Sequence, residues 1–141
     1  MALVCDTGPV YALYDANDAH HATVKAAIEA EPGPLFLPVI LLAELDYLLH
    51  VRLGVDAALD FLESIEQGSF TLVPVTREDL SRCRELMTQY RDLGLGLADG
   101  SVIATAERLG IQRILTVDER HFRAVQPRRF SHFILIPADG R

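Results

Sequence analysis

Short apolar runs, each followed by a stretch long enough for one or more helices, constrain the fold of this 141-residue chain more than any other feature. Such runs predict five strands, at residues 2–5, 35–37, 70–73, 113–117 and 133–136, the first of them buried. Strands that alternate with helices indicate an α/β fold with a central, mainly parallel sheet, and right-handed crossovers place helices on both faces. We therefore expect one three-layer α/β/α domain over residues 1–141.

Helix start and stop signals support this arrangement. Asp6 followed by Pro9 predicts a helix to about residue 14, and a second helix is expected from Asp18 until the breaker at residues 32–34. Gly54 ends a strongly apolar helix that Pro38 opens. Three further helices are expected at residues 56–67, 76–91 and from residue 98 or 99 to 110.

The charge is distributed unevenly along the chain. The net charge of −7 argues against an indiscriminate nucleic-acid binder. Residues 1–70 carry two basic residues against eleven acids, whereas residues 71–141 carry eleven basic residues against nine acids. Six arginines fall within residues 108–130. A polyanion could dock on this half, and a solvated arginine face is the alternative.

The location expected from the sequence is the cytoplasm. No signal peptide is evident at the N-terminus, and the most apolar stretch, residues 35–49, is interrupted by Pro38, Glu44 and Asp46. Cys5 and Cys83 lack the spacing of a zinc site, and Cys5 is expected to be a small core residue.

Three acids stand out by their position. Asp6 and Asp118 each follow a predicted strand directly, and in parallel α/β sheets ligands bind outside the carboxyl ends of the strands. Asp99 lies near a helix start within an apolar stretch. Each has a structural alternative, since Asp6 and Asp99 could cap helices and Asp118 could be an ordinary turn residue.

Glu44 is the least ordinary acid. Its helical neighbours three and four residues away are all apolar or aromatic: Ile40, Leu41, Tyr47 and Leu48. A carboxylate on such a face is costly unless a metal ion or an arginine compensates it.

Four carboxylates at one site would repel one another, and some would take up protons. A hard divalent cation such as Mg²⁺, or alternatively Mn²⁺, satisfies them with oxygen ligands. Such an ion beside a phosphate activates water and stabilises the leaving oxygen, which favours phosphodiester hydrolysis.

Four motifs resemble a known family when they are taken in order. They are Asp6-Thr7-Gly8, Ala43-Glu44-Leu45, Ala98-Asp99 with Ile103-Ala104, and Leu115-Thr116-Val117-Asp118. Together they resemble the PIN domain, and within it the chain is most similar to the VapC toxins of VapBC toxin–antitoxin systems. The resemblance covers essentially the whole chain, as a single PIN domain at residues 1–141.

The resemblance implies roles for particular residues. Asp6 and Asp99 would be the main metal ligands, and Glu44 and Asp118 would complete the site. Two hydroxyl residues, Thr7 and Thr116, would orient the carboxylates.

Four more residues are open in their roles. Arg120 and His121 are candidate RNA contacts, and His121 could equally pack locally. Asp46 could pair with His50 along its helix, and the role of Glu119 is open.

The resemblance also implies an activity and partners. It implies a Mg²⁺-dependent endoribonuclease that is a homodimer and is inhibited by a VapB-like antitoxin. The target RNA and the number of metal ions stay open. The alternative is a PIN-like module that binds RNA or protein without cutting it.

Other phosphate-handling folds match less well. A haloacid-dehalogenase-like phosphatase needs a second aspartate two residues after the first, where this chain has Gly8. A receiver domain needs a suitably placed lysine, and the one lysine, Lys25, lies in an early predicted helix.

Overall fold

The computed structural model describes residues 1–140, and its centre is a five-stranded, wholly parallel sheet. The strand order is β3-β2-β1-β4-β5. The strands are β1 (Leu3–Cys5), β2 (Leu35–Pro38), β3 (Thr71–Val73), β4 (Arg113–Leu115) and β5 (Ile134–Ile136). All five lie within or overlap the predicted runs, so the predicted α/β class with a mainly parallel sheet is confirmed.

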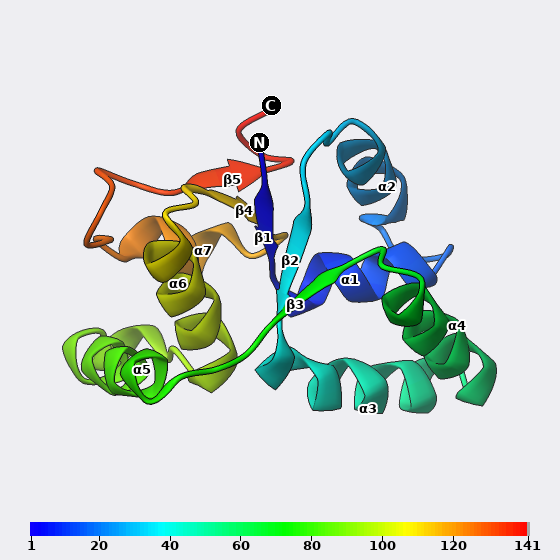
Figure 1. Ribbon diagram of the computed structural model, residues 1–141, viewed down its shortest axis with the longest axis horizontal. Coiled ribbons are helices and arrows are strands. Elements are labelled where there is room, and N and C mark those ends of the chain that lie inside the picture. Colours follow the sequence, from blue (N-terminus) through cyan, green and yellow to red (C-terminus); the bar gives the residue numbers. More distant parts are fainter. Residues whose placement is uncertain (141) are drawn as a thin grey trace.

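Helices cover both faces of the sheet (Figure 1). One layer holds α1 (Thr7–Tyr14), α2 (His21–Glu29), α3 (Leu42–Arg52) and α4 (Val55–Glu66), on the right of the view. The other holds α5 (Arg77–Gln89), α6 (Leu97–Leu109) and α7 (Glu119–Ala124). Short 3₁₀ turns, η1 (Val39–Leu41) and η2 (Arg91–Leu93), precede α3 and α6. None of the helices in residues 1–140 is long and apolar enough to cross a membrane.

The central strand β1 determines where a site can form. Its residues Leu3, Val4 and Cys5 are completely buried between β2 and β4, which confirms Cys5 as a core residue. From β1 the chain runs outward to β2 and β3, and it later returns to the other side of β1 to form β4. The strand order therefore reverses between β1 and β4, and their carboxyl ends form the crevice where such sheets bind ligands.

Two predicted helix starts differ from the structure by more than one residue. The second helix begins at His21, because the carboxylate of Asp18 accepts the backbone N–H of His20 and holds a turn instead of capping a helix. The segment expected to be helical from Pro38 begins instead as the 3₁₀ turn η1, and the α-helix starts at Leu42. By contrast, Thr76 and Asp79 form the predicted start of α5 as a reciprocal capping box.

The short helix α7 was not predicted. Asp118 is its N-cap, and its side chain accepts the His121 backbone N–H at 3.4 Å. Asp118 also lies three residues beyond the end of β4, not directly after it as the sequence suggested. After β4 the chain therefore turns back at the carboxyl edge of the sheet, and α7 lies against α6.

Candidate active site

A pocket of about 540 Å³ opens at the carboxyl edge of the sheet. It is lined by residues of α1, α3, α6 and the connection from β4 to α7. The four predicted acids are all in its lining: Asp6, Glu44, Asp99 and Asp118. Four segments that lie far apart in the sequence thus bring carboxyl groups to one cavity.

Asp6 is fixed in this pocket by the strands beside it, and only 6% of it is exposed. Its backbone N–H donates to the Leu115 carbonyl at 2.9 Å, which continues the β1–β4 pairing. The Thr116 hydroxyl donates to Asp6 Oδ2 at 2.8 Å and accepts the Asp118 backbone N–H at 2.9 Å. Thr116 therefore sets the positions of two acids at once. Asp6 is at the N-cap of α1, but its side chain makes no capping bond, so the capping alternative does not explain its carboxylate.

Electrostatics in the pocket disfavour negative charge. Burial raises the pKa of Asp6 from 3.8 to about 6, and repulsion from Asp99 and Asp118 acts in the same direction. Burial also raises the pKa of Asp99, against the opposing influence of His121. Acids that face one another with raised pKa values indicate negative charge that the protein alone does not compensate, and a bound cation relieves this condition.

Glu44 reaches the pocket from α3. The Thr7 hydroxyl of α1 donates to Glu44 Oε1 at 2.8 Å, so the second predicted hydroxyl also orients an acid. The structure corrects the reason for which Glu44 was selected, because this residue is solvent-exposed and not enclosed among apolar neighbours. Tyr47, on the same helix, is also exposed.

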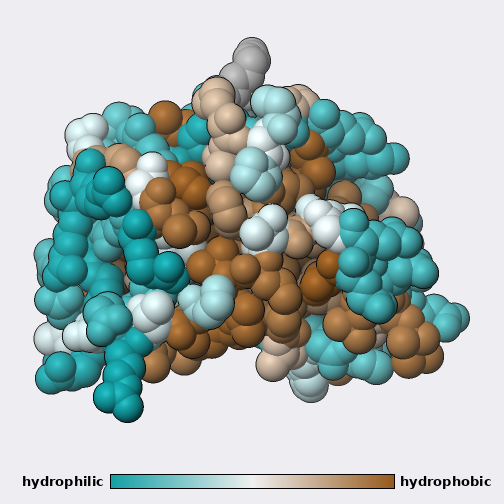
Figure 2. Space-filling model, viewed as in Figure 1, coloured by the Kyte–Doolittle hydropathy of each residue, from teal (hydrophilic) through white to brown (hydrophobic). Residues whose placement is uncertain are grey.

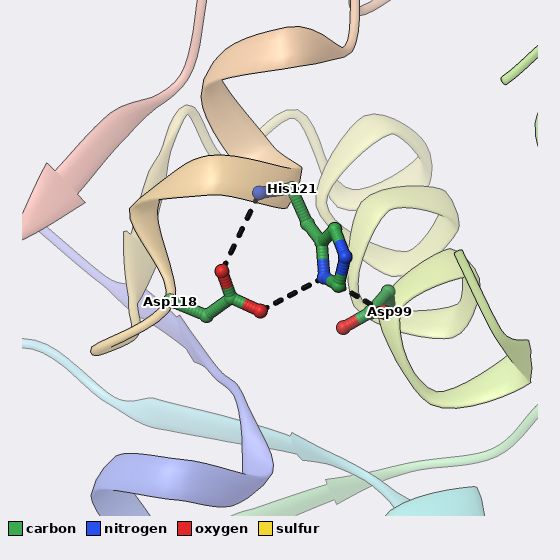
Figure 3. A group of neighbouring side chains, drawn as sticks. All are labelled: Asp99, Asp118 and His121. Carbon is green, nitrogen blue, oxygen red and sulfur yellow. Dashed lines mark hydrogen bonds and ion pairs between the residues drawn. The ribbon is translucent and has the colours of Figure 1, made fainter. Parts of the chain in front are cut away.

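Asp99 and Asp118 meet through His121 (Figure 3). Asp99 is in the first turn of α6, three residues after its N-cap Gly96, so it is not the capping residue. The His121 ring points from α7 between the two acids, with Nδ1 2.8 Å from Asp118 Oδ2 and 3.3 Å from Asp99 Oδ2. Asp99, Asp118 and His121 each offer one ligand atom, and these atoms lie within 4.8 Å of one another.

The other residues singled out in the sequence lie at the margin or outside. Arg120 is exposed on α7 and makes no ion pair within residues 1–140. Glu119 pairs with Arg123, and Asp46 lies 3.4 Å from His50, as the helical spacing suggested. Neither Glu119 nor Asp46 lines the pocket.

The arginine-rich stretch is mostly engaged within the chain. Five of its six arginines contact acidic side chains or a backbone carbonyl: Arg108, Arg113, Arg123, Arg128 and Arg129. Four of these five arginines are nonetheless solvent-exposed, and only Arg113 is partly buried. The stretch is therefore largely a solvated arginine face, as one of the two alternatives expected, and its members pair with neighbouring groups of the same chain.

Sequence reasoning did not find the contact between His121 and the acids. Its ring Nε2 lies 3.2 Å from the Leu93 carbonyl, and Nδ1 faces the two carboxylates. The spacing of Asp118 and His121, three residues apart, was a local signal for a short capped helix. The link to Asp99 and Leu93 depends on packing between α6 and α7 and had no signal in the sequence.

The oxygen-rich donor set of the pocket suits a hard divalent cation. The fold and the site together define a class of α/β proteins in which a pocket lined by carboxyl groups lies where the strand order reverses, the point at which such sheets bind ligands. The model of the PIN domain matches residues 3–126, and the chain belongs to the PIN-domain family.

Particular relatives agree with this assignment. The chain is 33% identical over 135 residues to Ribonuclease VapC26 of Mycobacterium tuberculosis (strain ATCC 25618 / H37Rv), covering 96% of this chain and all of that protein. The crystal structure of M. tuberculosis VapC20, described as a sarcin–ricin loop cleaving toxin, superposes with a TM-score of 0.79 at 24% identity, over 86% of this chain and 94% of that chain.

FitAcB from Neisseria gonorrhoeae gives a TM-score of 0.69 at 20% identity, over 90% of this chain and 94% of that chain. At these identities the two structures support the fold alone.

Proposed function

We propose that this protein is a metal-dependent endoribonuclease and the toxin of a type II toxin–antitoxin pair, with residues 1–141 forming one PIN domain. The observation that carries the proposal is the convergence of Asp6, Glu44, Asp99 and Asp118 on one pocket. A surface that only bound RNA would gain nothing from acids that repel one another. The likeness to a ribonuclease over nearly the whole chain supports the same activity.

Within this proposal, Asp6 and Asp99 are the main ligands of Mg²⁺ or Mn²⁺, and Glu44 and Asp118 complete the site. A bound divalent cation supplies a water of lowered pKa and stabilises the leaving oxygen of the phosphodiester. The Thr116 hydroxyl donates to Oδ2 of Asp6 and so fixes the orientation of this carboxylate towards the ion.

Thr7 has the matching role for Glu44, because its hydroxyl fixes Oε1 of that exposed side chain at the pocket rim. Two acids that would otherwise sample several rotamers are thereby held in place before substrate arrives. Arg120, exposed on α7 two residues after Asp118, is the candidate contact to the RNA backbone.

Partners are part of the proposal. Exposed apolar side chains gather on α3 and α4: Tyr47, Val51, Val55, Leu59 and Leu62. Apolar surface is also extensive in the lower half of the view in Figure 2. Exposed patches of this kind mark protein interfaces, which supports a homodimer and a VapB-like antitoxin as the molecules that cover them. RNA cleavage of this kind would take place in the cytoplasm.

The test is cleavage of total cellular RNA by purified protein with Mn²⁺ or Mg²⁺, with chelator, and with Asp6→Asn and Asp99→Asn variants. Asp60→Asn is the matched control, because Asp60 is exposed on α4 outside the pocket. We expect discrete fragments only with metal and an intact acid set, whereas RNA binding by Asp99→Asn survives. Equal cleavage by Asp99→Asn and wild type would refute the site.

Absence of cleavage by folded, antitoxin-free wild type under every condition would instead support a binding module. The ends of any fragments would identify the RNA class.

A further inference from the structure

The orientation of His121 is determined by a backbone carbonyl. Its Nε2 lies 3.2 Å from the oxygen of Leu93, in the 3₁₀ turn before α6. A carbonyl oxygen accepts hydrogen bonds and cannot donate one, so Nε2 must carry the proton. In the neutral ring, Nδ1 then presents a lone pair.

That lone pair lies close to two acids but is not directed straight at either of their oxygens. Nδ1 lies 2.8 Å from Asp118 Oδ2 and 3.3 Å from Asp99 Oδ2, yet it is buried and has no hydrogen-bond partner of acceptable geometry. Only 17% of the His121 side chain is exposed, so water does not readily satisfy it. A buried lone pair that faces carboxylate oxygens is unfavourable unless a positive charge lies between them.

Building on the function proposed above, we propose that His121 Nδ1 is a direct metal ligand beside Asp99 and Asp118. Two atoms that bind one cation at about 2.1 Å in octahedral geometry lie about 3 Å apart, and the two Nδ1–oxygen separations bracket that value. Metal-binding histidines usually donate their other ring N–H to a carbonyl or carboxylate, which fixes the tautomer. Leu93 has that role here.

An imidazole ligand changes which ion the site prefers. Imidazole nitrogen suits Zn²⁺, Cu²⁺, Fe²⁺ and Ni²⁺ best, and both Mg²⁺ and Mn²⁺ favour carboxylates, but Mn²⁺ is a transition-metal ion and accepts a nitrogen ligand more readily than the harder Mg²⁺ does. Since His121 adds a nitrogen to an otherwise all-carboxylate site, it biases the pocket towards Mn²⁺ and against Mg²⁺.

A second arrangement makes the opposite prediction. If His121 is protonated at Nδ1, its imidazolium ring neutralises Asp99 and Asp118 as an internal cation. It would then compete with a metal ion, so removing it would leave the affinity for both ions unchanged or increase it.

The experiment measures Mn²⁺ and Mg²⁺ affinity by calorimetry, together with ¹⁴N hyperfine coupling to bound Mn²⁺ by pulsed EPR. The proteins are wild type, His121→Ala, His121→Asn and the control His132→Ala, whose histidine is exposed outside the pocket. Partners of metal ligands alone contribute about 10–100-fold to affinity. We therefore expect His121→Ala to lose at least about tenfold in Mn²⁺ affinity, and less in Mg²⁺ affinity.

Nitrogen coupling should be present in wild type and His132→Ala, and absent in His121→Ala. His121→Asn offers a hard oxygen in place of nitrogen, so its ratio of Mn²⁺ to Mg²⁺ affinity should fall while Mg²⁺ binding persists. Mn²⁺ binding by wild type without ¹⁴N coupling, or unchanged or higher affinity in His121→Ala, would overturn the ligand assignment and leave the carboxylate site intact. A wild type that binds neither ion would overturn this inference together with the proposed metal site.

Discussion

The carboxyl group of Asp6 is buried, accepts one hydroxyl hydrogen bond and faces two other acids. Its pKa rises from 3.8 in the free side chain to about 6 in the fold, so the folded chain holds this proton more tightly than the unfolded chain. This group stabilises the metal-free fold fully below pH 3.8, and its contribution is lost as the pH rises through about 6.

An asparagine at position 6 does not lose its contribution to stability as the pH rises, because the amide stays neutral and its oxygen still accepts a hydrogen bond from Thr116. We expect Asp6→Asn to stabilise the metal-free protein at pH 8 by about 1–3 kcal/mol and to have little effect at pH 4. Urea unfolding in chelator at both pH values measures this difference. A variant equally destabilised at both would show that the buried carboxylate is well compensated without metal.

For single residues, the sequence predicted which acids belong to the site but did not predict how they are arranged. The prediction of a shared site depended on Asp6 and Asp118 following strands, and Asp6 does so directly whereas Asp118 lies three residues beyond β4. Glu44 was selected for an apolar environment that it does not have, since the side chain is exposed. The contact of His121 with Asp99 and Leu93 joins two helices and a turn, and no periodicity in the chain encodes it.

Close packing of α5 on α6 depends on Gly100. A Cβ added there would lie 2.9 Å from Cys83 Sγ and 3.2 Å from Cys83 Cβ. Overpacking costs about 1–3 kcal/mol, whereas alanine in place of glycine favours a helix by about 1 kcal/mol. We expect Gly100→Ala to destabilise the protein by a net of up to about 2 kcal/mol in urea unfolding.

The double variant with Cys83→Ala distinguishes this cause. Removing the sulfur relieves the closest contact, so Gly100→Ala should cost less in that background than in wild type. If Gly100→Ala destabilised the protein equally in both backgrounds, the contact with the Cys83 sulfur would not be the cause of the destabilisation.

An ion pair between the same two helices is buried. Arg82 of α5 donates two hydrogen bonds to Glu107 of α6, at 2.8 and 2.9 Å, and the Glu107 carboxylate also accepts the backbone N–H of Arg128. Glu107→Gln leaves the Arg82 charge buried and uncompensated, which we expect to cost about 3–5 kcal/mol in thermal or urea unfolding.

The matched control is Glu85→Gln, which breaks an exposed pair with Arg128 and should cost about 1 kcal/mol or less. Similar losses for Glu107→Gln and Glu85→Gln would contradict the role assigned to burial.

Strands were more predictable than helix boundaries. Strands β1, β4 and β5 are short runs of mostly buried apolar residues, which is visible in composition alone, whereas only the last residue of the edge strand β3 is buried. The start of α2 and the 3₁₀ turn before α3 depend on which of several competing local hydrogen bonds form, as the turn at Asp18 illustrates. The helix α7 is only six residues long, too short for a hydrophobic period to appear.

For the molecule as a whole, a cation shared by acids from four segments should tie those segments together. Metal at about 100 times its Kd stabilises a fold by about 2.7 kcal/mol, which corresponds to a rise in Tm of roughly 5–10 °C for a chain of this size. We expect that rise with Mn²⁺ or Mg²⁺ at neutral pH, measured by differential scanning calorimetry. The double variant Asp6→Asn with Asp99→Asn should show none.

No rise in the wild type at millimolar metal would count against one shared site. An equal rise in the double variant would place the ion elsewhere on the protein.

The pairing of β1 with β4 has a consequence for synthesis. The hydrogen bond from Thr116 to Asp6 joins residues 110 positions apart. At translation speeds of about 5–20 residues per second, roughly 5–20 s pass between the emergence of the two. A nascent chain lacks the pocket throughout that interval, so a nuclease of this design does not threaten the messenger RNA that encodes it until translation of that copy is well advanced.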